Sequence, residues 1–150
     1  MGRIRAPKDK KALIDKLVRG DDNHPPFRTQ ADLLNFAAAL AFSRGGVVQP
    51  FTESLDNPIR QEVFERQGYD TAINLVALAM TEDIKILVAT DEAEATRIQY
   101  FEELANAGLE ILQNELEGVV DPLEHLLLLV GRQRQDENGE EEFDLSRFIG

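Results

Sequence analysis

Two histidines and several paired carboxylates are the residues of this sequence whose chemistry could serve catalysis or metal binding. His24 and His125 lack H-x-x-x-H or E-x-x-H spacing, and the chain has no cysteine, so no zinc ligand set can be assembled. Carboxylate pairs such as Glu102 and Glu103 fall on predicted solvent faces, whereas a general acid needs a cleft that raises its pKa. We therefore predict no catalytic residue, no metal site and no cofactor, and we expect a protein that is not an enzyme.

Basic side chains are concentrated at the start of the chain. Residues 1–20 carry seven basic and two acidic side chains, a formal charge of +5, whereas the remainder carries nine basic and 26 acidic side chains, or −17. An acidic body repels the phosphate backbone, so direct DNA binding by the protein alone is not expected. An alternative function is a DNA-associated subunit that uses the basic N-terminal residues Arg3, Arg5, Lys8, Lys10, Lys11 and Arg19.

The end of the sequence combines a run of acids with apolar side chains. Residues 136–144 are dense in carboxylates and lack apolar spacing, which is typical of a flexible linker. We therefore predict a helical domain at residues 1–132 and an acidic tail at residues 133–150. The apolar end of this tail is a candidate docking segment, either for a partner protein or for the chain's own core, and comprises Phe143, Leu145, Phe148 and Ile149.

A set of about six helices is predicted to position these residues. Apolar residues at helical spacing, with proline, glycine and capping residues between them, predict helices near residues 8–19, 29–44, 57–67, 70–80, 91–117 and 121–131. Residues 84–89 fit either a strand or a short buried helix, and we favour the helix. The predicted class is all-α (mainly α), a single compact multi-helix bundle in which a short strand near residues 47–49 is the one extended candidate.

Two of these helices are apolar on nearly every side. Within residues 33–42 only Asn35 is polar, and within residues 72–80 only Asn74 is. Helices of this kind are normally buried, so we place both at the centre of the bundle, although the same leucines and alanines would also suit an interface in a homo-oligomer. An unpaired buried amide costs about 1–3 kcal/mol, so Asn35 and Asn74 should bond each other or a nearby turn.

Four stretches carry a family resemblance: "FRTQADLLNFAAALAFSRG", "NPIRQEVFERQGYDTAINLVALA", "RIQYFEELANAGLEIL" and "DPLEHLLLLV". In order and spacing they resemble the small accessory proteins called DNA phosphorothioation (Dnd) system-associated protein 4. The third stretch in that family is closer to "YANGGLE", so Leu104 and Ala107 depart from it. The resemblance implies membership of a bacterial defence system that replaces a backbone oxygen of DNA with sulfur and restricts unmarked DNA. It carries over no catalytic residue.

The resemblance and the residues together predict a non-enzymatic adaptor or regulator that contacts proteins of the phosphorothioation modification or restriction machinery. Arg60 and Arg66 join the tail as candidate partner contacts. Alternatively, the acidic body could imitate DNA and regulate a nuclease. The N-terminal charges precede no apolar segment, and no apolar run reaches membrane-spanning length, so we expect a cytoplasmic protein without membrane contact.

Overall fold

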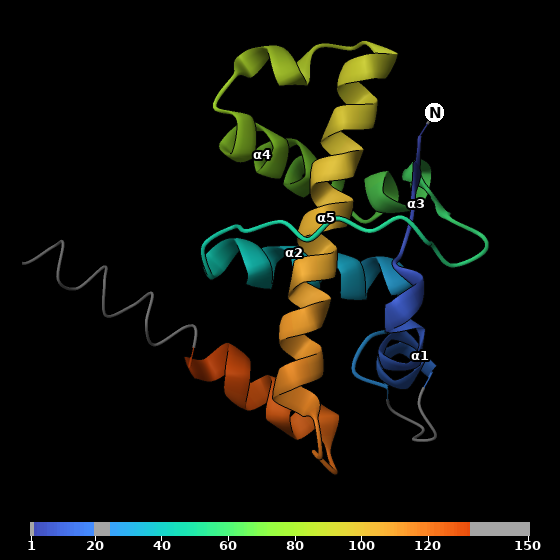
Figure 1. The fold of residues 1–150 in the computed structure, drawn as a ribbon, viewed down its shortest axis with the longest axis vertical. Helices are drawn as coiled ribbons and strands as arrows, with labels where there is room; N and C mark the ends of the chain where they lie inside the picture. The colour runs from blue at the N-terminus through green and yellow to red at the C-terminus, as the bar shows by residue number, and fades with distance from the viewer. Residues whose placement is uncertain (1, 20–24, 133–150) are drawn as a thin grey trace, which may run out of the picture. The chain divides into compact units, whose positions relative to one another are not determined.

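Helices make up most of the chain, as the sequence predicts (Figure 1). The computed structural model describes residues 2–19 and 25–132, and the chain divides into two compact units, Met1–Glu115 and Leu116–Gly150. The predicted mainly-α class is therefore confirmed. The elements of the described part are, in chain order, β1 (Arg3–Ile4), η1 (Lys8–Lys10), α1 (Lys11–Arg19), α2 (Gln30–Ser43), β2 (Ile59–Arg60), α3 (Gln61–Arg66), α4 (Asp70–Thr81), η2 (Ile84–Leu87) and α5 (Asp91–Leu116). A further helix follows at residues 122–132.

The short sheet lies elsewhere than predicted. β1 pairs antiparallel with β2, with Arg3 opposite Arg60 and Ile4 opposite Ile59. Ile4 is fully buried, so the pairing places an apolar side chain in the core. The following helix starts later in the sequence than predicted, because residues 59–60 are extended in the ladder and α3 begins only at Gln61. The prediction of a helix from residue 57 was therefore wrong at its start.

Residues 47–49, where a strand was predicted, form no strand. They pack along α5 instead: the amide of Gln49 donates to the carbonyl of Glu103 (3.0 Å), and the side-chain amide of Asn106 donates to the carbonyl of Gln49 (3.0 Å). The polar main chain of this segment is thus paired with a helix and needs no neighbouring strand. The prediction was wrong because sequence pattern alone does not reveal such a partner.

The core of the first unit forms where α5 crosses α2 (Figure 1). A side-chain carbon added at Gly108 would overlap the main chain of Ala37, so the two helices come as close as their backbones allow. Phe64 of α3 and Phe101 of α5 pack edge to face beside them, with ring centroids 5.5 Å apart. Glycine and alanine at the crossing therefore decide how closely the two helices pack.

The two apolar helices behave differently. α2 is buried along most of its length, including Leu33, Leu34 and Ala37, as predicted for a central helix. α4 is not surrounded, because only Ile73, Val76 and Ala77 of this helix are buried while its other side faces solvent. The prediction that α4 is a second central helix was wrong.

Capping residues fix where the helices begin. The hydroxyl of Thr29 accepts the amide of Asp32 (3.1 Å) at the start of α2, as predicted. At α5 the cap is Thr90, which accepts the amide of Ala93 (3.1 Å) and stands one residue before the predicted start of this helix at residue 91. Asp121 caps the helix of residues 122–132 by accepting the amide of Glu124 (3.3 Å). The predicted tail, residues 133–150, lies outside the described residues, so its separation from residues 1–132 stays a prediction.

Candidate functional site

Arg5, one of the predicted basic contacts, stabilises the fold. Glu102 is buried, so its predicted place on a solvent face was wrong. Its carboxylate accepts the main-chain amide of Arg5 (2.6 Å) and its guanidinium at Nε (3.2 Å) and at a terminal nitrogen (3.1 Å). The hydrogen bond to Glu102 raises the pKa of Arg5, against the smaller effect of burial. The Arg5 guanidinium also lies over the ring of Phe51, 5.0 Å from its centroid. Arg5 is thus committed to α5 and is not free for a ligand.

Lys10 and Lys11 are also engaged within the protein. Lys10 is 2 % exposed, and its Nζ lies 3.1 Å from Asp9 and 2.9 Å from Glu110 of α5. Burial alone would lower the pKa of Lys10, but the hydrogen bonds to Glu110 and Asp9 raise it above its usual value. Lys11 pairs with Asp15 one turn along α1, at 2.6 Å. Three of the six basic residues predicted from the sequence are therefore neutralised.

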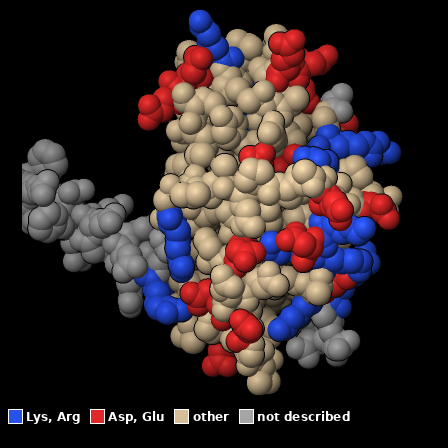
Figure 2. Space-filling view, in the orientation of Figure 1, with Lys and Arg blue, Asp and Glu red and all other residues tan. Residues whose placement is uncertain are grey.

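The other three, Arg3, Lys8 and Arg19, are exposed and have no carboxylate partner among the described residues. The structure adds Arg28 and Arg60, which are also exposed and unpaired within the part it describes. We call these five residues the free cations. Figure 2 shows Lys and Arg gathered over the side of the molecule where β1 and α1 lie in Figure 1.

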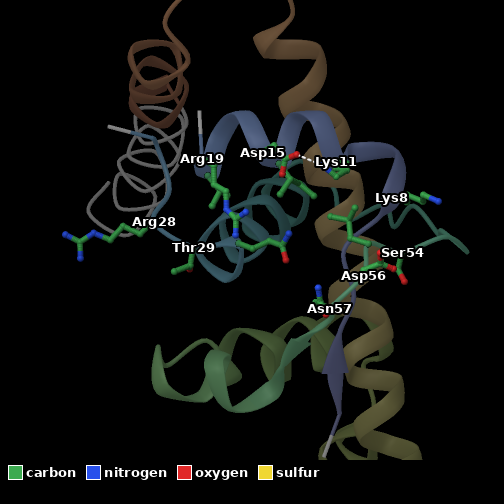
Figure 3. A pocket seen from close by; sticks show the side chains of 13 residues that line it. Lys8, Lys11, Asp15, Arg19, Arg28, Thr29, Ser54, Asp56 and Asn57 are labelled. Carbon is green, nitrogen blue, oxygen red and sulfur yellow. Dashed lines mark hydrogen bonds and ion pairs between the residues drawn. The ribbon is translucent and has the colours of Figure 1, made fainter. Parts of the chain in front are cut away.

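An open groove of about 710 Å³ runs between α1, the start of α2 and residues 54–57 (Figure 3). We call it the basic groove, because three free cations line it: Lys8, Arg19 and Arg28. Arg19 and Arg28 stand toward one end and Lys8 toward the other (Figure 3). Its described lining also includes apolar and neutral polar side chains, and none of these described residues carries an aromatic ring. The groove can therefore offer separated positive charges along a shallow surface.

A second candidate site comprises exposed apolar side chains of α4, of η2 and of the residue that follows η2. Leu75 of α4 is 60 % exposed, Ile84 and Leu87 of η2 are 75 % and 39 % exposed, and Val88, the next residue, is 46 % exposed. The two elements pack on each other, and Arg97 of α5 holds η2 by donating to the carbonyls of Ile86 (2.7 Å) and Val88 (2.9 Å). We call these four exposed side chains the α4–η2 patch. The sequence did not predict it, because it placed α4 and residues 84–89 in the core.

The remaining predicted contacts are scattered. The tail residues Phe143, Leu145, Phe148 and Ile149 lie outside the described residues. Arg66 is exposed at the last residue of α3, whereas Arg60 lies opposite Arg3 in the ladder. The structure therefore does not gather the predicted partner contacts into one described site.

Asn35 and Asn74 were predicted to bond each other or a nearby turn, and the structure shows neither for the side-chain oxygen of Asn35. Asn74 is exposed, and the side-chain oxygen of Asn35 is buried without a hydrogen-bond partner among the described residues. The amide that does lock a segment is Asn106, which is 1 % exposed and donates to Gln49. The signal for Asn106 was present in the stretch "LANAGLE", where one amide stands among leucines and alanines. The sequence pattern does not single out Asn106, because α5 carries many other polar residues.

The described residues contain no group of three or more His, Asp or Glu side chains arranged to hold a metal ion. His125 is half-buried in the helix of residues 122–132. Within the same described ranges, no helix has both the length and the apolar character that crossing a membrane requires.

The comparisons with known proteins place the chain in a family. The family model for DNA sulphur modification system-associated protein 4 matches residues 3–148. This chain belongs to that family. Searches of curated proteins and of solved structures each gave no match. The resemblance seen in the sequence is thus confirmed, and it extends through the predicted tail.

Within this DNA sulphur modification system-associated protein, the stretch "LANAGLE" has a structural role. Asn106 holds residues 47–49 against α5, and Gly108 allows the contact with α2. Leu104, which departs from the family phrase, is fully buried. Asn106, Gly108 and Leu104 of this stretch therefore help to build the core.

Proposed function

We propose that this protein is a non-enzymatic adaptor of a DNA sulphur modification system, and that it works by binding another protein of that system through the α4–η2 patch. The family match supports the association with the system. The observation that carries the contact is the exposure of four large apolar side chains on two elements packed together. Apolar side chains gathered in this way mark interaction surfaces more often than isolated ones do.

Charge around the patch indicates what kind of partner fits. Glu82 and Asp83 directly precede η2, and Asp91 and Glu92 follow it at the start of α5; all four are exposed. None of the four forms an ion pair within the described residues. An apolar surface flanked by unpaired carboxylates favours a partner segment with apolar anchors and basic neighbours. Such a partner also gains in association rate from its opposite charge.

The same charges argue against two other occupants of the patch. The protein's own tail is acidic over residues 136–144, so docking it here would bring carboxylates together. A second copy in a two-fold dimer would place the acidic flanks of one patch against those of the other. The exposed leucines of the helix at residues 122–132 adjoin undescribed residues, which makes the α4–η2 patch the better-founded surface.

The test is co-purification from the native host with the tagged full chain as bait. Proteins of the DNA sulphur modification system should be recovered with the parent chain and depleted about tenfold or more with the double variant Leu75→Ser/Ile84→Ser. The matched control is Val47→Ser/Val120→Ser, which removes two exposed apolar side chains outside the patch and should bind as the parent does. Circular dichroism would verify that each variant is folded.

A version ending at Gln135 separates the patch from the tail. If the truncated chain loses the same proteins while the patch variant keeps them, the tail is the docking segment and the proposal fails. Equal recovery by parent and patch variant would refute it as well. Recovery of the protein's own second copy alone, in place of machinery proteins, would replace the adaptor with a homo-oligomer.

A further inference from the structure

The free cations lack internal partners in a protein that is otherwise rich in carboxylates. Of the basic residues near the N-terminus, Arg5, Lys10 and Lys11 each have a carboxylate within 3.1 Å, whereas Arg3 and Arg19 have none within the described part. With a formal charge of −12, the chain has many acids that could have been placed beside them. Within the described part, the absence of such partners leaves the positive charges of Arg3 and Arg19 available for an external anion.

The ladder of β1 and β2 strengthens this point. Arg3 stands directly opposite Arg60, and both side chains are exposed. Like charges directly opposite each other on an antiparallel pair destabilise it. An anion lying between the two guanidinium groups would remove that repulsion, and arginine suits phosphate because its donors form a planar fork.

The arginine pair is close in sequence to the residues that line the basic groove. Asn57 lines the groove and stands two residues before β2, which carries Arg60. In Figure 3 the side chains of Lys8 and Arg28 extend outward at opposite ends and do not converge on one point. Separated, outward-pointing cations do not build a pocket for one small anion. They suit a ligand that carries several negative charges along its length.

The lining of the groove narrows the class of ligand further. Proteins that hold single-stranded nucleic acid stack its bases on aromatic side chains, and the described residues that line this groove include no aromatic side chain. Contacts to the phosphates of a duplex need only cations and polar donors on an open surface. We propose that the basic groove, extended by Arg3 and Arg60, binds the phosphate backbone of a nucleic-acid duplex without reading its sequence.

The overall negative charge sets the strength of this contact. Asp15 is paired with Lys11, so Asp56 is the unpaired carboxylate among the described residues that line the groove. Repulsion by the distant acids weakens binding but does not remove the local cations. Binding by the protein alone is therefore expected to be weak, strongly salt-dependent and easiest to measure at low ionic strength.

Fluorescence anisotropy with the full chain and a short labelled DNA duplex, titrated at salt concentrations from about 20 mM to about 200 mM, tests the proposal. At low salt, the affinity of the double variant Arg19→Glu/Arg28→Glu for the duplex should be lower by about tenfold or more. Its plot of log affinity against log salt should be shallower by about 2, since each phosphate contact contributes about 0.9 to that slope. The matched control Arg66→Glu/Lys85→Glu makes the same change in net charge with two exposed cations outside the groove.

The outcomes divide clearly. Loss of affinity in the groove variant but not in the control supports the proposal, whereas equal losses would show a general effect of net charge and overturn it. No binding by the parent chain at the lowest salt would overturn it too. Preference for a single strand of the same sequence would contradict the duplex assignment. An RNA duplex in a parallel titration distinguishes the source of the phosphates, with similar affinity expected for contacts to the backbone alone.

Discussion

At the scale of single residues, the N-terminal charges divide into those that hold the fold and those that face solvent. Arg5 and Lys10 reach Glu102 and Glu110, which lie eight residues apart on α5 and therefore on the same side of that helix. The sequence shows seven basic residues near the N-terminus without showing this division. This division depends on the positions of Glu102 and Glu110, about a hundred residues further along the chain.

Replacing Glu102 tests the role of Arg5. Glu102→Gln should lower the free energy of unfolding by about 1–3 kcal/mol, because the buried carboxylate accepts three hydrogen bonds from one residue. Glu103→Gln, the same change at the neighbouring position, should cost less than about 0.5 kcal/mol. Urea unfolding followed by circular dichroism measures both variants. Equal effects would mean that the Arg5 contact contributes nothing specific.

The buried Lys10 makes stability depend on alkaline pH. Because its pKa is raised in the folded protein, the stabilisation is fully present below about pH 10 and is lost as pH rises through the raised value. Lys10→Met should therefore be less stable than the parent at pH 8 by about 1–3 kcal/mol, with a smaller difference at higher pH. Urea unfolding across this range measures the difference.

Tyr69 also titrates in this range, since its hydrogen bond to Asp32 raises its pKa, but it is present in both proteins and cancels in their difference. Lys11→Met is the control, because Lys11 is exposed and its pair with Asp15 should contribute less than about 1 kcal/mol. A parent–Lys10→Met difference that is constant with pH would show that the ion pairs of Lys10 do not stabilise the fold.

At the scale of elements, the crossing of α2 and α5 sets the geometry of the first unit. Gly108→Ala should destabilise the protein by about 1–3 kcal/mol through overpacking, although alanine favours a helix by about 1 kcal/mol over glycine. Adding Ala37→Gly should not restore stability, because the added carbon meets the main chain of residue 37 and not its side chain. Gly131→Ala, at a helical glycine with open space around it, should be neutral or slightly stabilising. Thermal unfolding of the three variants measures these changes in stability.

The elements also show what the sequence could predict. Helix positions were predictable because proline, glycine and capping residues such as Thr29 act locally. Which helix is central was not predictable for α4, since its apolar composition matches that of α2 while its surroundings differ. The exposed patch and the basic groove both depend on contacts between distant segments. Periodicity could therefore predict the class of fold, and composition named three of the free cations, but neither could predict the groove or the patch.

At the scale of the whole molecule, we expect the two proposed surfaces to work independently. The patch variant Leu75→Ser/Ile84→Ser should lose machinery proteins but bind the DNA duplex with unchanged affinity and salt slope. The groove variant Arg19→Glu/Arg28→Glu should show the reverse. Co-purification and anisotropy on the same two proteins measure this separation. Loss of both activities in either variant would point to one shared surface or to a folding defect, which circular dichroism distinguishes.

The attachment of the N-terminal strand to α5 has a consequence for synthesis of the chain. Arg5 and Glu102 are 97 residues apart, and the amide of Gly2 donates to Glu94, 92 residues away. While the ribosome is still making the middle of the protein, the first ten residues therefore have no α5 to bind. The first unit can close only after α5 has emerged, and contacts of such long range slow folding. Until that moment the free cations and their buried neighbours are equally accessible to other molecules in the cell.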